Sequence, residues 1–386
     1  MVTPEIQQRL VDIRRDIHQH PELSWQETRT ASKVCQALEE LGLPYRSNVG
    51  ETGVIAEIAG QRAGPFIALR ADLDALPIVE ETGLPFASQV DGVMHACAHD
   101  GHTSMLIGAA MLLSQGEPPP LPIRLIFQPA EEAARGAKRL IEEGVLDDVA
   151  MIFGGHIDRH YPCGAIVVTE GAVNASSDKF SIEISGQGGH AARPHEAVDA
   201  VVVGSLLVIA LQTIVSREIN PAHPSVVSIG RFDAGTAGNV IAGHALLEGS
   251  IRAQHPEVRH ELHKSIRRIA DSVAQLHDAQ IEVEIREGPP PLINSDEMTA
   301  LARKAALQTV SEDKVVKLIT ANMGGEDFSY YMDHVPGCYV RYGAQIPGRE
   351  GYPAHSSRFD FDEEALGIGA AYLANVAREA ALSLLR

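Results

Sequence analysis

The sequence lacks the features that mark several large classes of protein. It has no surplus of basic residues: its 386 residues carry a formal net charge of −19, whereas nucleic-acid binders normally show a basic patch or excess. It has no run of about 20 apolar residues. Its N-terminal segment is amphipathic and charged, without the apolar stretch of a secretory signal. We therefore expect no nucleic-acid partner and no membrane span.

Cysteine is also scarce. The four cysteines, Cys35, Cys97, Cys163 and Cys338, are spread widely over the chain. Such spacing does not indicate a disulfide framework and favours a reducing compartment. Together with the absence of a signal segment, it predicts a cytoplasmic location.

The rest of the composition is that of an ordinary folded protein, with 45% hydrophobic and 22% charged residues. The length predicts two domains. In the first part of the chain, short apolar runs of strand type alternate with segments of helical periodicity. The strands are expected at 54–59, 66–71, 123–128 and 150–156, and the helices at 4–20, 27–42, 101–115 and 134–144. This alternation predicts an α/β domain with a mostly parallel sheet covered on both faces.

The middle of the chain follows a different pattern. Segments 179–185 and 281–286 alternate strictly between apolar and polar residues, which predicts strands with one solvated face. Between them we expect a helix, two strands and a second helix, at 196–215, 225–232, 245–252 and 257–277. The order β-α-β-β-α-β predicts an inserted ferredoxin-like α+β domain.

We place this inserted domain at 178–289, because the prolines at 289–291 mark its exit. Segments 1–177 and 290–386 then form the other domain, and helices are expected near 296–310 and 362–385. The edge strands and helices of an inserted domain can pair across a two-fold axis, so we expect a homodimer.

Residues capable of metal chemistry gather where predicted strands end, which is where sites form in open α/β sheets. The densest segment runs from His95 to His102 and contains Cys97 and His99. A thiolate and an imidazole two residues apart can both face one ion, and both are preferred ligands of zinc and similar metals. The alternative is a buried structural cysteine beside surface histidines. The three histidines and the aspartate around this thiol favour the metal site.

The adjacent carboxylates Glu131 and Glu132 follow the predicted strand 123–128. Two such groups at a strand end can point in opposite directions, so that one binds a metal while the other faces a substrate water. Taken alone, the pair is more typical of an exposed helix start, which the helix dipole favours.

Two further histidines are candidates: His156 follows the apolar residues of a predicted strand, and His355 lies in the loop before the last helix. Each alone is more typical of a turn residue than of a ligand. Asp74 follows the predicted strand 66–71, where it is well placed to hydrogen-bond a ligating histidine.

Taken together, these segments resemble the aminoacylase/carboxypeptidase superfamily of co-catalytic metallopeptidases. Within it they are similar to the branch of hippurate hydrolases, indole-acetyl-amino-acid hydrolases and N-acetyl-diaminopimelate deacetylases. The resemblance covers nearly the whole chain in order, through HQHPELSWQE (18–27), RADLDALP (70–77), MHACAHDGHT (94–103), QPAEE (128–132), GGHI (154–157), GGHAARPHEAVD (188–199), AGNVIAG (237–243), GSIR (249–252), GGEDFSYY (324–331) and HSSRFDFDEEAL (355–366).

The resemblance implies a metal-dependent amidohydrolase that cleaves the amide bond of N-acyl amino acids with two divalent ions. The ions would be zinc or manganese, with cobalt and nickel as alternatives. Cys97 would bridge them, His99 and His156 would complete the binding of one ion, and Glu132 and His355 would complete the other.

The resemblance also implies roles for four residues around the substrate. Glu131 would be the general base and later the general acid. His190, in the inserted lid and dimerisation domain, would stabilise the oxyanion, and in dimeric relatives this histidine can come from the partner subunit. Asn239 and Arg252 would hold the substrate carboxylate.

Two residues depart from the family pattern, and two other functions stay open. Ala98 stands where glycine is usual, a change we expect to be tolerated. Gly155 stands where leucine is usual, which would enlarge the acyl pocket or loosen the loop.

One alternative function is that of a dipeptidase or carboxypeptidase, although such relatives often have aspartate where this chain has Cys97. The other is a non-catalytic binding relative, which would lack a base or a ligand. A zinc-stabilised structural protein is disfavoured, because it would use closed four-ligand sites.

Overall fold

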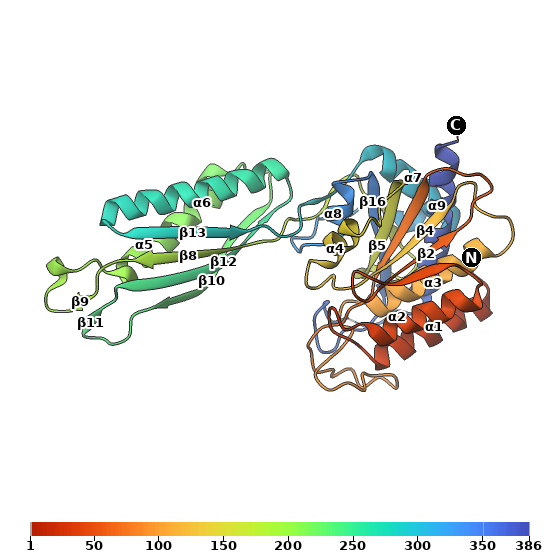
Figure 1. Cartoon of the computed structure of the whole chain (residues 1–386), viewed down its shortest axis with the longest axis horizontal. Coiled ribbons are helices and arrows are strands. Elements are labelled where there is room, and N and C mark those ends of the chain that lie inside the picture. Colours follow the sequence, from red (N-terminus) through yellow and green to blue (C-terminus); the bar gives the residue numbers. More distant parts are fainter. Residues whose placement is uncertain (1, 350, 386) are drawn as a thin grey trace. The chain divides into compact units, whose positions relative to one another are not determined.

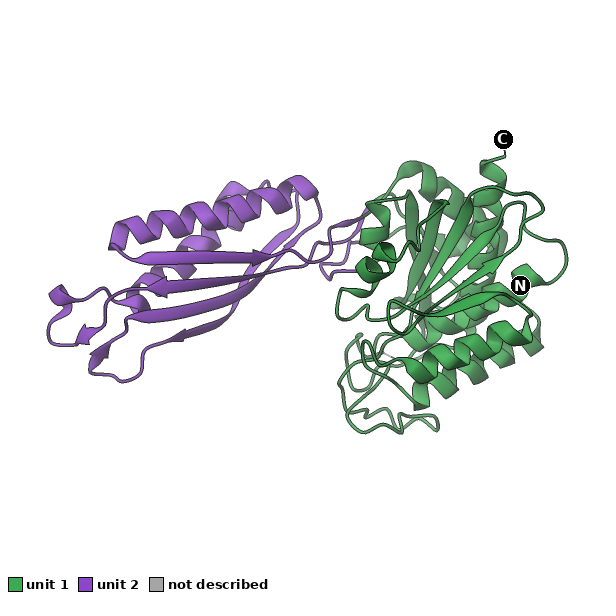
Figure 2. Cartoon of the chain, in the orientation of Figure 1, with its two compact units in different colours: residues 1–171, 293–319, 327–386 green, residues 172–292, 320–326 purple. Residues whose placement is uncertain are grey.

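The structure is a computed structural model that describes residues 2–349 and 351–385. Backbone contacts divide the chain into two compact units (Figure 2). Unit 1 comprises Met1–Gly171, Ile293–Ile319 and Asp327–Arg386, and unit 2 comprises Ala172–Leu292 and Thr320–Glu326. The chain therefore leaves unit 1 twice. From the sequence we expect only the first excursion, with the narrower bounds 178–289, and place 320–326 in the other domain.

Unit 1 is built on an eight-stranded sheet. In spatial order its strands are β1 (Tyr45–Val49), β2 (Gly53–Ile58), β4 (Ile123–Gln128), β3 (Phe66–Asp72), β5 (Val149–Pro162), β16 (Gly337–Gln345), β6 (Ile166–Val167) and β15 (Val315–Val316). The sheet has four central strands that run parallel to one another, β4, β3, β5 and β16. Antiparallel pairs occur toward both edges. The mostly parallel α/β fold expected from the sequence is confirmed.

Helices cover both faces of this sheet (Figure 1). On one face α3 (His99–Ser114) and α9 (Glu364–Ser383) pack against the strands and each other, and they are flanked by α1 (Pro4–Gln19), α2 (Thr28–Glu40) and α7 (Asp296–Thr309). On the other face α4 (Gly136–Glu142) packs against α8 (Ser329–Met332). Helix α3 is buried along almost its whole length, which explains why apolar residues surround its axis.

Unit 2 contains a four-stranded antiparallel sheet. Its spatial order is β10 (Ser225–Ala234), β12 (His244–Ala253), β8 (Asp178–Ser185) and β13 (Gln280–Arg286). Helices α5 (Ala200–Thr213) and α6 (Pro256–His277) each bury one apolar side against the same face of this sheet. Along the chain the order is β8-α5-β10-β12-α6-β13, which is the predicted β-α-β-β-α-β arrangement.

The smaller elements complete the chain. Two short two-stranded sheets pair β9 (Gly189–His190) with β11 (Val240–Ile241), and β7 (Gly171–Asn174) with β14 (Leu292–Asn294). Two 3-10 turns cover Pro194–Glu196 and Glu312–Lys314. A π-helical turn, Ile214–Glu218, extends α5.

From the sequence we expect no apolar segment long enough to span a membrane. Among the described residues, the structure contains one helix of such length and composition, Ala200–Glu218, formed by α5 and its π-helical extension. The core helices of soluble proteins pass the same test, so this property by itself is weak evidence for a membrane span. Several of its apolar side chains are exposed in the single chain: Val201, Val202, Leu206 and Ile209.

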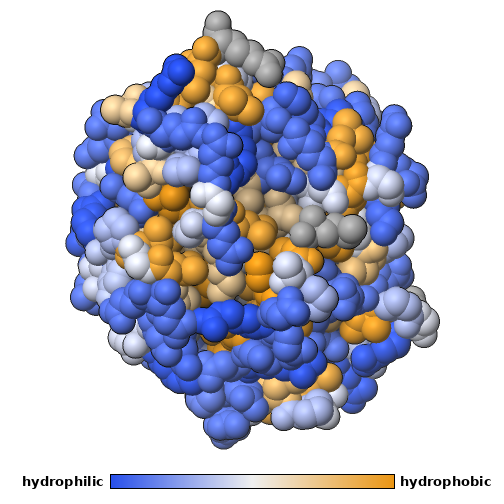
Figure 3. Space-filling model, turned by 90° about the vertical axis from the view of Figure 1, so that its right-hand side faces the viewer, coloured by the Kyte–Doolittle hydropathy of each residue, from blue (hydrophilic) through white to orange (hydrophobic). Residues whose placement is uncertain are grey.

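The surface of unit 1 mixes residue types in the usual way. On the face turned toward the viewer in Figure 3, apolar residues are interspersed among a hydrophilic majority. Scattered apolar residues of this kind are normal on protein surfaces. The apolar interior of the unit is one continuous cluster formed by the sheet and the helices that cover it.

Candidate metal centre

Cys97 and His99 lie on the turn that leads into α3. Between them Ala98 adopts a left-handed conformation, with φ of 64° and ψ of 18°. A non-glycine residue in this region is strained, and such strain often occurs at functional sites. This turn brings the Cys97 thiol and the His99 imidazole to one place, and both side chains belong to the same candidate ligand group.

His156 lies on β5 with its ring turned toward this thiol. Its Nδ1 lies 2.7 Å from the carbonyl oxygen of Ile157, a group that only accepts, so Nδ1 carries the proton. Its Nε2 lies 3.3 Å from Sγ of Cys97. The unprotonated nitrogen of His156 therefore faces the thiol, as metal ligation requires.

Glu131 and Glu132 follow β4 after Ala130, which is again left-handed at φ 53°. The Asp74 carboxylate fixes this turn, because Oδ1 accepts the amide of Glu131 and Oδ2 accepts the amide of Glu132, each at 3.0 Å. Ser24 donates its hydroxyl to the same Oδ2 at 2.7 Å. Asp74 thus anchors the backbone from which both glutamates project.

The structure gives Asp74 a further role that differs in detail from the expectation. Nδ1 of His99 is 2.8 Å from the backbone carbonyl of Asp74 and 3.4 Å from its carboxylate. The backbone oxygen, rather than the carboxylate, is therefore the main partner of this ring. Since a carbonyl only accepts, Nδ1 carries a proton, and in the neutral ring Nε2 keeps its lone pair.

His355 reaches the same place from the loop before α9. Its backbone amide donates to the carbonyl of Ala96 at 2.8 Å, and its Nε2 lies 3.3 Å from Oε1 of Glu132. His355 is itself left-handed, with φ of 68°. Three non-glycine residues in this strained conformation therefore surround the site: Ala98, Ala130 and His355.

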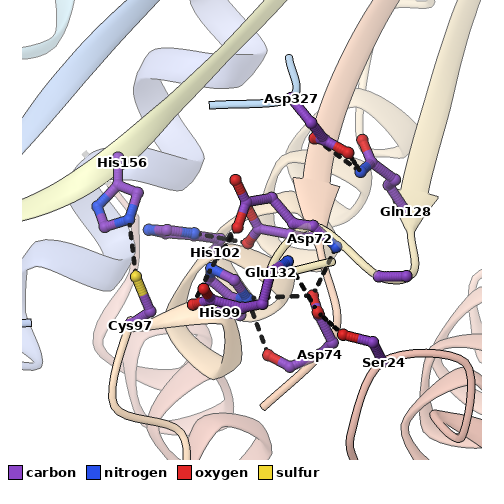
Figure 4. A network of polar contacts seen from close by, with 12 residues as sticks. Ser24, Asp72, Asp74, Cys97, His99, His102, Gln128, Glu132, His156 and Asp327 are labelled. Carbon is purple, nitrogen blue, oxygen red and sulfur yellow. Dashed lines mark hydrogen bonds and ion pairs between the residues drawn. The ribbon is translucent and has the colours of Figure 1, made fainter. Parts of the chain in front are cut away.

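These five side chains, far apart in the sequence, form two overlapping groups that share Cys97 (Figure 4 labels Cys97, His99, Glu132 and His156). Cys97, His99 and His156 make one group, and Cys97, Glu132 and His355 make the other; within each group the ligand atoms lie within 4.8 Å of one another. Nε2 of His99 and Oε1 of Glu132 are buried without a hydrogen-bond partner. Because buried polar atoms normally have partners, and because thiolate, imidazole and carboxylate suit borderline divalent ions, this arrangement fits metal ions.

The electrostatics of the cluster fit the same interpretation. Burial raises the pKa of the Cys97 thiol to about 12, and the charge of Glu132 adds to this shift. Burial also holds the pKa of His156 well below its usual value. For His99, burial acts in the same direction, but Asp72 and Asp74 outweigh it and raise the pKa. A divalent ion would replace the proton that the Cys97 thiol otherwise retains.

Glu131 lies beside the cluster without belonging to either group that contains Cys97. Its Oε2 is 3.9 Å from Nε2 of His99, and Oε1 of Glu132 is 4.0 Å from the same nitrogen. The two carboxylates therefore flank one imidazole, and Glu131 is close enough to exchange a proton with a molecule bound at the cluster.

A second layer of buried polar residues was not identified from the sequence. Asp72, at the end of β3, contacts His102 on α3 and Arg70 on its own strand. Arg70 also donates to Gln128, at the end of β4. Arg70 and Asp72 belong to the motif RADLDALP, in which only Asp74 is given a role on sequence grounds. A charged pair within a buried strand was the available signal.

The other predicted residues, His190, Asn239 and Arg252, belong to unit 2. His190 and Asn239 lie together, since the amide of Ala191 donates to the carbonyl of Asn239 at 3.2 Å and β9 pairs with β11. Arg252 lies near the far end of β12. Burial lowers its pKa, and the nearby Asp178 opposes this shift. Within unit 2, these three residues do not form one site.

The structure also shows what occupies the space that Gly155 leaves. A Cβ at this position would lie 2.8 Å from Cε2 and Cζ of Tyr342 and from Cγ2 of Val340. Tyr342 is buried and packs edge-on against Tyr372 of α9. Because alternate residues of a strand face opposite sides, Gly155 faces the core while His156 faces the metal cluster. The missing side chain is therefore replaced by core packing on the face away from that cluster.

Comparison with known proteins gives consistent matches. The family model for peptidase family M20/M25/M40 matches residues 68–379. The chain is 43% identical over 379 residues to an N-acetylcysteine deacetylase of Bacillus subtilis, covering 96% of each. It is 40% identical over 380 residues to thermostable carboxypeptidase 1 of Saccharolobus solfataricus, covering 95% of this chain and 94% of the relative.

Among solved structures, the fold is similar to that of the YXEP protein of Bacillus subtilis, described as a dinuclear metal-binding peptidase. The TM-score is 0.88 and the sequence identity 39%, with 99% of this chain and 100% of the other covered. This likeness extends over both units.

Proposed function

Because the chain belongs to peptidase family M20/M25/M40, we propose that the cluster around Cys97 cleaves the amide bond of N-acyl amino acids. The protein is a metal-dependent amidohydrolase with two divalent metal ions. The observation that carries the assignment of residues is the sharing of Cys97 by two ligand groups, with Glu131 beside them and outside both.

In the proposed arrangement both ions would be held by Cys97. His99 and His156 would complete the binding of one, and Glu132 and His355 would complete that of the other. The bound ions would supply Lewis acidity for lowering the pKa of water and polarising the scissile carbonyl. The mixture of sulfur, nitrogen and oxygen ligands suits zinc or manganese, with cobalt and nickel as alternatives.

Glu131 moves the proton in this proposal. Its backbone is held by Asp74, so its carboxylate projects from a fixed position beside His99. It takes the proton of the attacking water and delivers it to the amine that leaves, which is general base followed by general acid catalysis.

His190 is proposed to stabilise the oxyanion. The amide of Ala192 donates to its Nδ1 at 3.0 Å, and an amide can only donate, so in the neutral ring the proton lies on Nε2. This nitrogen belongs to an exposed side chain. The ring is thus prepared to donate a hydrogen bond, as an oxyanion requires.

Asn239 and Arg252 are proposed to hold the substrate carboxylate, and their separation supports the proposal of a second subunit. Strand β12 runs from His244 to Ala253, so roughly 26 Å separates Arg252 from the start of the strand, at about 3.3 Å per residue. His190 and Asn239 lie on the ribbon beyond that start. One unit 2 cannot offer both ends to one small substrate, so we propose that a partner subunit supplies His190 and Asn239.

The surface of unit 2 supports a homodimer. The exposed side of α5 carries Val201, Val202, Leu206 and Ile209, the last of which is 65% exposed. Beside it, β10 is an edge strand of the sheet. Exposed apolar patches and open strand edges are typical of interaction sites.

The test of the function is a panel of N-acyl amino acids, assayed after chelation and after return of zinc or manganese. We expect chelation to abolish hydrolysis and the metal to restore it. Glu131→Gln should keep both ions but lose most turnover, whereas Glu142→Gln, an exposed change on α4, should behave like the parent. Full activity of Glu131→Gln would overturn the mechanism. Because a carboxypeptidase is 40% identical, the panel includes peptides with a free amino terminus; faster cleavage of these would establish a peptidase instead.

The subunit arrangement is tested by mixing two inactive variants, His190→Asn and Glu131→Gln. If His190 acts across the interface, a mixed dimer regains one intact site, and a random mixture recovers about a quarter of the parent activity. If His190 acts within its own chain, the mixture stays inactive. Size-exclusion chromatography with light scattering shows whether a dimer is present.

A further inference from the structure

His102 is buried next to the metal cluster, yet both of its ring nitrogens are already occupied. The backbone amide of Ile157 donates to its Nε2 at 2.9 Å. Since an amide can only donate, this nitrogen carries a lone pair, and the ring proton must lie on Nδ1. Nδ1 is 2.7 Å from Oδ1 of Asp72, which accepts that proton in a hydrogen bond.

This proton arrangement removes His102 from the set of metal ligands. By distance alone, Asp72, His99 and His102 could form a site, because their ligand atoms lie within 4.8 Å of one another. Ligation by His102 would require one ring nitrogen to give up its present partner, which would leave either the Ile157 amide or an oxygen of Asp72 without that hydrogen bond. A buried donor or acceptor left without a partner lowers the stability of the fold.

His102 and His156 are linked through a single residue, Ile157. Ile157 donates its amide to His102, and its carbonyl accepts Nδ1–H of His156 at 2.7 Å. The same residue is therefore tied on one side to a fixed imidazole and on the other to a proposed ligand. As a result, Nε2 of His156 faces Sγ of Cys97.

Behind His102 the contacts continue through buried groups. Oδ2 of Asp72 accepts Nη1 of Arg70 at 2.5 Å, and Nε of Arg70 donates to the side chain of Gln128 at 2.8 Å. Gln128 ends the strand that precedes Glu131 and Glu132 (Figure 4). One polar chain thus joins α3, β3, β4 and β5, and three of these four elements carry or lead into proposed metal ligands.

We propose that His102 is a positioning residue of the metal centre, which holds Ile157 and through it fixes the direction in which His156 presents Nε2. The proposal rests on the ligand assignment of the proposed function. It predicts a selective effect, because the ion bound by His99 and His156 depends on this contact more than the ion bound by Glu132 and His355. Loss of such an outer contact typically weakens metal binding by about 10- to 100-fold.

The experiment compares His102→Leu, which has no polar group, with His102→Gln, which offers both a donor and an acceptor. Met111→Leu is the control, a buried change on the same helix. Zinc is titrated into each metal-free protein by calorimetry. We expect His102→Leu to bind one ion about 10- to 100-fold more weakly and the other nearly as the parent does, His102→Gln to recover part of the loss, and Met111→Leu to match the parent.

A second measurement separates this idea from the proposed function, because it needs neither metal nor substrate. Hydrogen exchange of the Ile157 amide is followed in the metal-free proteins, and we expect faster exchange in His102→Leu than in Met111→Leu. Unchanged exchange together with unchanged binding of both ions would overturn the proposal. A change of the His102 Nε2 nitrogen resonance to that of a ligated ring on zinc addition would also overturn it. If His102→Leu does not fold, His102→Gln decides by the same measurements. Failure of every acyl substrate would overturn the proposed function but leave this result standing.

Discussion

Replacing Gly155 by alanine tests whether this position faces the core, as the packing around Tyr342 indicates. The added methyl would lie 2.8 Å from two ring atoms of Tyr342 and from a methyl group of Val340. Tyr342 is 2% exposed and its ring is packed against Tyr372, so it has little room to move. Overpacking of this kind costs about 1–3 kcal/mol.

A part of this loss is recovered, because alanine restricts the unfolded chain more than glycine and so stabilises by about 0.4–1 kcal/mol. We therefore expect Gly155→Ala to lower the free energy of unfolding by about 1–2 kcal/mol. Urea denaturation followed by fluorescence measures it, since the single tryptophan, Trp25, lies in unit 1 together with Gly155.

The cause is isolated by a double-mutant cycle with Tyr342→Leu. In that background the contacts with the ring are gone and only the contact with Val340 remains, so the cost of Gly155→Ala should fall. Gly230→Ala is the control, because nothing lies within 4 Å of its added Cβ and it belongs to unit 2; it should leave the Trp25 transition unchanged. Equal costs of Gly155→Ala in both backgrounds would refute the packing argument.

Three further outcomes are expected. Ala98→Gly should change the free energy of unfolding by less than about 1 kcal/mol. Relief of left-handed strain gains about 1–2 kcal/mol, but the loss of a buried methyl and the freer unfolded chain offset this gain. A loss of several kcal/mol in urea denaturation would contradict this prediction. Burial alone would raise the pKa of Asp178, but its contacts with His263 and Arg259 outweigh burial and lower it. Asp178→Asn removes the charge that makes these contacts and should destabilise unit 2 by about 3 kcal/mol at pH 7. The stability that the Asp178 charge contributes is present above the unfolded pKa of about 3.9 and is lost as the pH falls through the lower folded pKa. Hydrogen exchange of β8 measures the difference in stability between parent and variant. A difference that stays constant down to pH 2 would contradict this prediction. Zinc binding at pH 7 should release about one proton from Cys97, whose pKa is about 12 without metal; calorimetry in buffers of different ionisation enthalpy measures this, and equal proton release by Cys97→Ser would contradict it.

Much of the fold was predictable because its signals are local. Period-two alternation in 179–185 and 281–286 identified strands β8 and β13, and the order of elements between them gave the topology of unit 2. Strand β16 was missed, since its apolar run contains glycines and Arg341 and its strand pairing is made with β5 and β6, which are distant in the sequence. The second excursion, Thr320–Glu326, carries no local pattern that distinguishes it from a surface loop.

For the candidate site, the sequence predicts the ligands but not the residues that orient them. The five proposed ligands lie in motifs with a distinctive composition, and the structure brings them together. The role of His102 was not accessible, because the sequence does not show which nitrogen of an imidazole carries the proton. That assignment depends on a backbone amide 55 residues away.

The second excursion of the chain has a consequence for the order in which the protein can be completed on the ribosome. Ala175 donates its amide to the carbonyl of Asn322, and Asn322 donates to the carbonyl of Val173, each at 2.9 Å. Unit 2 therefore lacks one of its own backbone partners until synthesis has passed residue 326, long after its sheet and helices have emerged. A gene fragment that ends at residue 292 would encode most of this unit but would omit the segment that closes it. Transplanting the unit into another enzyme would therefore require two separate pieces of sequence.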